Sequence, residues 1–250
     1  MVRFAKVTKS YGTLTVLDQL DLDIASGEMV TVIGPSGSGK TTVLRMLMTL
    51  EKINGGVIYV EGEPMTHMEK GGQLVAANSA HLRRVRSKIG MCFQHFNLFP
   101  HMTALENCME GSVQVPGISK PEARARAETL LEQVGMADKR SHRPAQLSGG
   151  QQQRVAIART LAMRPKVMLF DEVTSEVIGE VTNVIRTLTA EHALTMLMVT
   201  HQMGFAKDSS GRIRLFYKGK IEEQGSPKEL FENPQKPRTQ QFLSAVREAI

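Results

Sequence analysis

At residues 34–41 the chain carries the sequence Gly34-Pro35-Ser36-Gly37-Ser38-Gly39-Lys40-Thr41. A short apolar run, residues 29–33, comes directly before it, and residues 40–50 place apolar side chains at helical spacing. A glycine-rich turn of this G-x-x-x-x-G-K-T spacing, between a buried strand and a helix, is the pattern of a phosphate-binding loop. The alternative is an ordinary glycine-rich turn, which the combined motif and context disfavour.

The residue types of this loop indicate how it would bind a nucleotide. Glycines allow backbone N–H groups to face phosphate oxygens, and the N-terminus of the following helix adds a partial positive charge. Lys40 supplies positive charge at the β- and γ-phosphates, and Thr41 offers a hydroxyl to Mg²⁺. We therefore expect Mg²⁺ and ATP as ligands, with ATP contacted by Gly34, Pro35, Ser36, Gly37, Ser38, Gly39, Lys40, Thr41 and Thr42.

Two further apolar runs end in polar residues that could reach the same nucleotide. Residues 167–170 run into Asp171 and Glu172, and residues 194–199 precede His201. Strands alternate with helices, which predicts a parallel sheet whose strands share one ligand-binding edge at their carboxyl ends. We expect Asp171 to hold Mg²⁺ through its water shell, and Glu172 to act as general base on the attacking water. His201 could bond the γ-phosphate; a solvated acidic turn and a structural histidine are the alternatives.

Two more side chains are candidates because of their place in the chain. Gln94 follows the apolar residues 89–93 and could reach Mg²⁺ or the attacking water. Tyr11, early in the first group of strands, could stack on adenine. A surface glutamine and a half-buried structural tyrosine are the alternatives, so both assignments depend on the whole pattern.

A second candidate anion site is Leu147-Ser148-Gly149-Gly150-Gln151. Ser148 is a good N-cap for the helix that follows, and the two glycines expose backbone N–H groups at its start. Alone this would be a capped helix without a ligand. Because the chain already has a complete phosphate loop, the second element is better explained as a site for the nucleotide of a partner molecule.

Composition narrows the class of protein. The 250 residues are 41% hydrophobic and 22% charged, which can bury a core, and no apolar run approaches the ~20 residues of a membrane span. The first residues lack the apolar stretch of a signal peptide, so we expect a cytoplasmic location. Cys92 and Cys108 show no metal or disulfide spacing. Net charge is +6, but the basic residues 81–88 are better explained as a solvated helix face than as a nucleic-acid patch.

The chain is predicted to be one α/β domain of 250 residues with a parallel-sheet core. Residues 20–24 alternate as in a half-buried strand, and residues 213–221 resemble a hairpin. We place the core, with an N-terminal antiparallel β subdomain, in about 1–94 and 165–230. An inserted helical subdomain would occupy about 95–164, and a helical tail 231–250.

Taken together, these motifs resemble those of ATP-binding-cassette (ABC) ATPases, a class of P-loop NTPases, from about residue 4 to residue 230. The chain is most similar to the ATP-binding subunits of bacterial importers for polar amino acids, through residues 90–101, 147–159 and 199–206. Within that branch it resembles ectoine/hydroxyectoine uptake ATPases.

The resemblance implies a mechanism and partners. Two subunits, most simply a homodimer, would face head to tail, with each ATP between one phosphate loop and the partner's copy of Ser148, Gly149, Gly150 and Gln151. Closure around ATP would act on transmembrane permease subunits at the cytoplasmic face of the membrane. One of these would dock on the segment after Gln94, and a separate solute-binding protein would deliver the solute. Nucleic acid is not an expected partner.

One departure from the family pattern bears on activity. After Ser175 the family usually continues with Ala-Leu-Asp-Pro before a Glu, whereas here Glu176 follows directly, about four residues early. In the family that loop carries an Asp at the dimer interface. Gly211 is a smaller departure, because the family usually has Asp there. The alternatives to a transporter ATPase are therefore a cassette that binds ATP but turns over weakly, and a soluble cassette protein outside transport.

Overall fold

The computed structural model describes residues 1–115, 117–172 and 194–248. In this part of the chain, six strands form a central sheet in the order β12-β11-β3-β10-β9-β8. The pairs β11/β3, β3/β10, β10/β9 and β9/β8 are parallel, and β12 is an antiparallel edge strand. The strands are β3 (Met29–Ile33), β8 (Ile89–Cys92), β9 (Val167–Asp171), β10 (Thr195–Val199), β11 (Arg212–Tyr217) and β12 (Lys220–Gly225).

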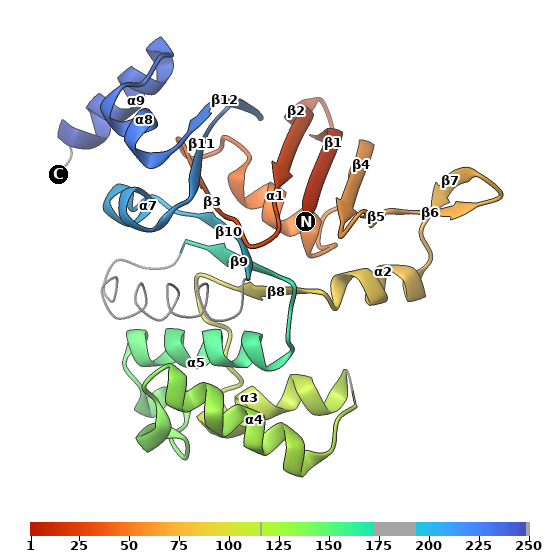
Figure 1. The fold of residues 1–250 in the computed structure, drawn as a ribbon, viewed down its shortest axis with the longest axis vertical. Helices are drawn as coiled ribbons and strands as arrows, with labels where there is room; N and C mark the ends of the chain where they lie inside the picture. The colour runs from red at the N-terminus through yellow and green to blue at the C-terminus, as the bar shows by residue number, and fades with distance from the viewer. Residues whose placement is uncertain (116, 173–193, 249–250) are drawn as a thin grey trace.

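A second, antiparallel sheet in the order β2-β1-β4-β5 lies beside the first (Figure 1). Its strands are β1 (Val2–Tyr11), β2 (Leu14–Ile24), β4 (Gly55–Val60) and β5 (Glu63–Pro64). The alternation predicted in residues 20–24 is confirmed, since Leu20, Leu22 and Ile24 are buried and the aspartates between them are exposed.

The central sheet is covered on both faces, which explains why its strands are continuous apolar runs. Met196 and Met198 of β10 face one core, which is shared with the helices α3 (Ala104–Gln114), α4 (Lys120–Gln133) and α5 (Gly149–Ala162). Leu197 and Val199 face the other, shared with α1 (Lys40–Leu47) and the N-terminal sheet. Figure 1 shows α3, α4 and α5 in green as a layer of their own.

The remaining elements frame these layers. They are α2 (Ser79–Arg86), the short 3₁₀ helices η1 (Ala137–Lys139) and η2 (Pro144–Gln146), α7 (Met203–Ser209), α8 (Pro227–Glu232) and α9 (Pro237–Glu248). Among the described residues, no helix has both the length and the apolar character needed to cross a membrane.

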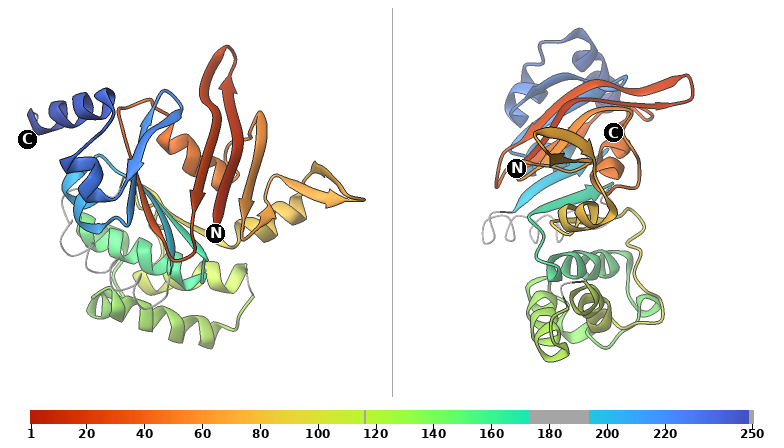
Figure 2. Two further views of the ribbon diagram at one scale, coloured as in Figure 1. Left: turned by 45° about the horizontal axis from the view of Figure 1, so that its top comes forward. Right: turned by 90° about the vertical axis from the view of Figure 1, so that its right-hand side faces the viewer.

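Two details differ from the sequence expectation. The helix predicted over residues 40–50 ends at Leu47, because Thr49 is left-handed at φ 56° and the chain turns away. A hairpin of β6 (His67–Lys70) and β7 (Gln73–Ala76), missed by the sequence analysis, projects from the molecule (Figure 2). The shortened segment after Ser175 lies outside the described residues.

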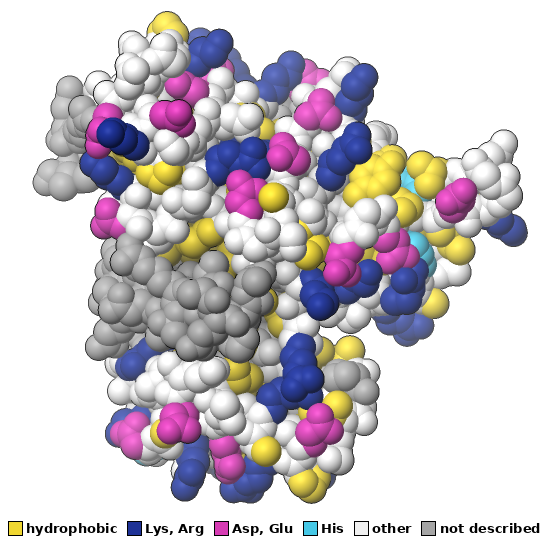
Figure 3. Space-filling view, in the orientation of Figure 1, with side chains coloured by type: hydrophobic (Ala, Val, Ile, Leu, Met, Phe, Trp, Pro, Cys, Tyr) yellow, Lys and Arg dark blue, Asp and Glu magenta, His cyan; other side chains and the backbone are white. Residues whose placement is uncertain are grey.

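The cysteines and the basic stretch have structural roles. Cys92 and Cys108 are free and buried, and desolvation raises their pKa values to about 11 and about 12. In the basic stretch, Arg84 pairs with Glu63, and Lys88 pairs with Glu63 at 3.3 Å. Figure 3 shows basic and acidic side chains interspersed over this face, as on a solvated surface.

A buried arginine gives the fold a dependence on one exposed carboxylate. The Arg214 side chain in β11 is fully buried, and its Nη2 donates to the carbonyl oxygen and Oδ1 of Asp23 at 2.6 and 3.1 Å. Asp23→Ala leaves this guanidinium buried without its counter-ion. We expect the free energy of unfolding to fall by about 2 kcal/mol, measured by urea denaturation. Asp18→Ala, which breaks the exposed pair with Lys220, should cost less than about 1 kcal/mol.

The pH dependence supplies a further check on this ion pair. Desolvation opposes the shift, but the hydrogen bond from Arg212 and the charge of Arg214 lower the pKa of Asp23. A carboxylate with a lowered folded pKa stabilises the fold above its unfolded pKa of ~3.9. This stabilisation is lost as the pH falls through the folded pKa. The difference between wild type and Asp23→Ala should therefore shrink below about pH 4, and a difference that stays constant down to about pH 2 would contradict the assignment.

Candidate nucleotide site

The phosphate loop has a conformation that requires glycine at two positions. Gly34 has φ 142°, and a Cβ there would lie 2.3 Å from the carbonyl oxygen of Phe216. Gly39, the N-cap of α1, has φ 103°, and its Cβ would lie 2.8 Å from Cδ2 of Leu17. The loop therefore packs closely between β11 and β2. Only glycine fits at these two positions, because any side chain would clash and because φ is positive.

Polar groups inside the loop are arranged for an anion. The Lys40 side chain is buried, and its Nζ donates to the carbonyl oxygens of Gly34 at 2.8 Å and Pro35 at 2.9 Å. Burial lowers the pKa of Lys40, while the nearby Glu172 and Asp171 raise it. The buried Ser38 hydroxyl oxygen has no hydrogen-bond partner. A bound phosphate would partner this hydroxyl and compensate the buried ammonium.

The topology brings four strand ends to the same edge of the sheet. In the parallel registers Val199 lies beside both Val32 and Asp171, and Cys92 lies beside Phe170. The residues that follow β3, β10, β9 and β8 therefore emerge side by side. They include the phosphate loop, His201, Glu172 and Gln94.

Asp171 is the last residue of β9 and lies against the phosphate loop. Thr41 Oγ1 donates to its Oδ1 at 3.4 Å. Burial raises the pKa of Asp171, as does the charge of Glu172, while Thr41 lowers it. In the described residues, no cluster of three or more His, Cys, Asp or Glu could hold a metal alone. A hydroxyl and one carboxylate fit Mg²⁺ that arrives with nucleotide phosphates, because Mg²⁺ keeps waters and few protein ligands.

Glu172 and His201 meet at this edge. His201 Nε2 lies 2.7 Å from Glu172 Oε1, and both side chains are partly exposed. Glu172 has a left-handed backbone at φ 47°, and its N–H donates to Val199 O at 2.9 Å. Such a conformation is unfavourable for glutamate, so the hydrogen bond to Val199 of β10 must hold the backbone of Glu172 in place.

Tyr11 and Gln94 are the two remaining candidates for the site. Tyr11 ends β1 and is 45% exposed, and β2, its hairpin partner, contacts Gly39 through Val16 and Leu17. Gln94 lies exposed in the turn after β8. Sequence analysis missed two residues beneath Tyr11, namely Lys9 and Glu51; the signal for Lys9 was its place two residues before Tyr11 on the same strand face.

The second candidate anion site, residues 147–151, is called the Ser148 element below. It lies in the helical layer rather than at the edge of the sheet that carries the phosphate loop. Ser148 caps α5 by accepting from Gln151 N at 3.3 Å, and Ser148 N donates to Gln151 Oε1 at 3.0 Å. Ser148 and Gly149 are exposed, and Gly150 is buried. No contact described in the structure joins them to the phosphate loop of the same chain.

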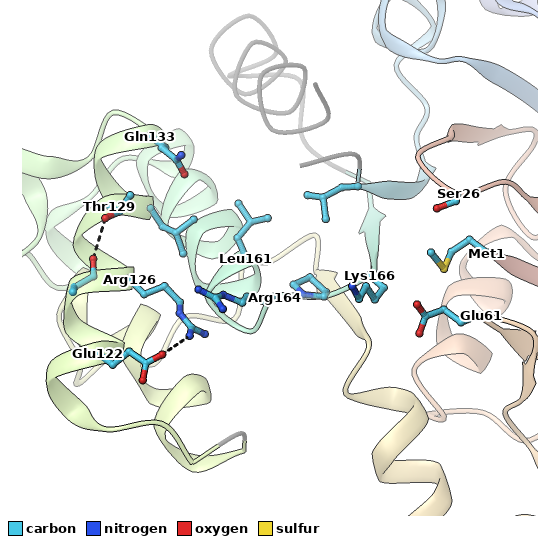
Figure 4. Close-up of a pocket in the computed structure, with 14 residues that line it drawn as sticks. Met1, Ser26, Glu61, Glu122, Arg126, Thr129, Gln133, Leu161, Arg164 and Lys166 are labelled. Atoms are coloured by element: carbon cyan, nitrogen blue, oxygen red, sulfur yellow. Dashed lines mark hydrogen bonds and ion pairs between the residues drawn. The ribbon is translucent and has the colours of Figure 1, made fainter. Parts of the chain in front are cut away.

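A cavity of about 860 Å³ lies elsewhere, between α4 and the amino ends of the strands (Figure 4). Its lining includes Met1 and Lys166, which precede β1 and β9, and Arg126 of α4. It is therefore at the sheet edge opposite the phosphate loop.

A parallel sheet with a phosphate loop and an acidic strand end defines a phosphate-loop nucleotide-binding protein. Within that class, a family model described as "ABC transporter" matches residues 17–175. The chain belongs to the ABC transporter family, and it is an ATPase of that family. ATP is therefore its nucleotide.

Relatives of known designation cover nearly the whole chain. The probable amino-acid ABC transporter ATP-binding protein y4tH of Sinorhizobium fredii is 58% identical and covers 98% of this chain, which covers 97% of that protein. The histidine/lysine/arginine/ornithine transport ATP-binding protein HisP of Escherichia coli is 49% identical, with 94% and 93% covered.

Solved structures confirm the fold class. A dimeric post-hydrolysis state of the ATP-binding cassette MJ0796, bound to ADP and Pi, matches with a TM-score of 0.77 at 33% identity. The match covers 91% of this chain and 99% of that chain. CbiO1 from Clostridium perfringens, at 23% identity, covers 99% of this chain and 97% of that chain, has a TM-score of 0.82 and supports the fold alone.

Proposed function

We propose that this chain powers the uptake of a polar amino acid as the ATP-hydrolysing subunit of a bacterial importer. The observation that carries the proposal is the convergence of the phosphate loop, Asp171, Glu172 and His201 at one sheet edge. The designations of the relatives, which name amino-acid transport, support the choice of solute.

Each residue of the proposed site has its own role in ATP binding and hydrolysis. The loop from Gly34 to Thr42 binds the phosphates, and Lys40 neutralises the β- and γ-phosphates. Thr41, Asp171 and Gln94 would hold Mg²⁺, which supplies charge stabilisation at the phosphates when bound. Glu172 accepts a proton from the attacking water, and His201, 2.7 Å from it, orients that carboxylate and the γ-phosphate.

The Ser148 element completes the site of a second molecule. Its exposed cap and its lack of a described contact with the chain's own loop favour a head-to-tail homodimer. In that arrangement Ser148, Gly149, Gly150 and Gln151 face the partner's ATP. The MJ0796 cassette, which is similar to this chain and dimeric, supports a dimer.

An importer also needs subunits that cross the membrane and a protein that binds the solute. Transmembrane permease subunits would hold this subunit at the cytoplasmic face of the membrane, and a solute-binding protein would deliver the solute. Related proteins are designated for arginine, and for histidine, lysine, arginine and ornithine. A basic or other polar amino acid is therefore our first candidate, and ectoine or hydroxyectoine is the alternative.

Uptake in cells tests the solute. In a host strain that lacks this gene, uptake of one labelled polar amino acid should fall to background and return with the wild-type chain. Glu172→Gln should express equally and fail to restore it. Arginine, histidine, glutamine, cystine and ectoine are compared in parallel. Loss of ectoine uptake alone would select the alternative, and unchanged uptake of all five would argue against a transport role.

A further inference from the structure

A buried lysine lies against the ring of Tyr11 and pairs with a partly exposed glutamate. Lys9 is 7% exposed, and its Nζ lies 3.0 Å from Glu51 Oε2 and donates to Lys52 O at 2.9 Å. The same ammonium lies 4.4 Å from the centroid of the Tyr11 ring. Burying a lysine is costly even when it is paired, because the ammonium loses part of its hydration. The pair therefore calls for a reason beyond stability.

The position of Lys9 on β1 brings its ammonium to the Tyr11 ring. Lys9 and Tyr11 are two residues apart on β1, so their side chains share one face of the sheet. Desolvation raises the pKa of Tyr11, as does the nearby Glu51 carboxylate. With one ring face against the ammonium, 4.4 Å from the ring centroid, this contact favours one orientation of the ring.

Glu51 also joins the ring to the helix of the phosphate loop. It lies in the loop that follows α1, where Arg45 Nε approaches its Oε1 at 3.7 Å. Asn54, three residues on, bonds β1 twice, through Thr8 O and Ser10 N, each at 2.8 Å. One short helix therefore carries the phosphate loop at its start and the support of Tyr11 after its end.

We infer that Lys9 and Glu51 are positioning residues that hold Tyr11 as the stacking surface for the base of the nucleotide. This rests on the proposed site, in which Tyr11 contacts adenine. The cation beneath the ring is held by the ring's electron-rich face, so the opposite face is fixed for a purine. The two residues do not touch the phosphates.

Binding measurements on the full chain test the inference, with Mg-ATP and Mg-tripolyphosphate, which lacks a base, as probes. Lys9→Met should weaken ATP binding about five- to tenfold and change tripolyphosphate binding less than about twofold. Lys9→Met leaves the Glu51 carboxylate without this partner, so a second variant, Glu51→Ala, removes that carboxylate instead. It should show the same pattern. Arg3→Met is the matched control, because Arg3 is also in β1 and its guanidinium lies over another ring, that of Tyr59 in β4.

A double-mutant cycle separates positioning from general structure. In a Tyr11→Ala background, Lys9→Met should have no further effect on ATP affinity. Equal losses for both probes, or additive losses in the cycle, would overturn the inference, as would an ATP affinity unchanged by Lys9→Met and Glu51→Ala. If Tyr11→Ala itself leaves ATP affinity unchanged, the proposed adenine contact fails, and the inference fails with it.

Discussion

Replacing Glu172 with Gln is expected to lower the rate of ATP hydrolysis by about 10²- to 10⁴-fold, because an amide cannot accept the proton of the attacking water. The amide keeps the shape of the side chain and can still bond His201, which lies 2.7 Å from the carboxylate. ATP affinity should therefore stay within about threefold of wild type. Steady-state phosphate release and equilibrium ATP binding measure the two effects on the same preparation.

The same variant should trap the closed dimer. Sedimentation of Glu172→Gln should show a dimer with Mg-ATP and a monomer without it, and Ser148→Arg in that background should abolish the dimer.

Two outcomes of the turnover measurement would change the assignment. Wild-type turnover at the level of Glu172→Gln would favour the weakly active cassette suggested by the segment after Ser175. Full turnover by Glu172→Gln would contradict the general-base assignment.

Lys40→Met is expected to weaken ATP binding about 30- to 100-fold through the loss of charge-assisted hydrogen bonds to phosphate. Its ammonium is buried and bonded to the carbonyl oxygens of Gly34 and Pro35. Burial lowers the pKa of Lys40, so keeping its ammonium charged costs more in the folded protein than in water. The thermal midpoint without nucleotide should therefore be unchanged or slightly raised. Calorimetric ATP binding and a melting curve measure both quantities.

The control for this prediction is Lys166→Met, which removes an exposed lysine at the opposite sheet edge. It changes net charge equally and should leave ATP affinity within about twofold. If both variants weaken binding alike, the effect would be general electrostatic attraction rather than a contact in the loop.

Much of the fold could be predicted because its signals are local. Buried strands of a parallel sheet are continuous apolar runs, so residues 29–33, 167–170 and 194–199 could be recognised alone. The hairpin of β6 and β7 was missed because all four residues of β7 are exposed and give no apolar alternation. The end of α1 was misplaced because Leu50 continues the helical spacing although it is exposed.

In the candidate site, too, the local features could be predicted from the sequence and the contacts between distant residues could not. The phosphate loop could be recognised from sequence because the turn and the helix start are local and depend on glycine and lysine at set spacings. The sequence also predicted the shared edge of Asp171, Glu172 and His201, because these residues come at or after the ends of buried strands in a parallel sheet. That a carboxylate and an imidazole meet at 2.7 Å, however, is a property of the folded strands.

By itself, the sequence determined the class of protein and the phosphate loop, because both depend on residues close together in the chain. Only the tertiary structure decided which side chains support that loop. Lys9 and Glu51 are 42 positions apart and meet beneath Tyr11 because β1 and the loop after α1 are hydrogen-bonded together. Such contacts come from the packing of distant segments, which leaves no local pattern in the sequence.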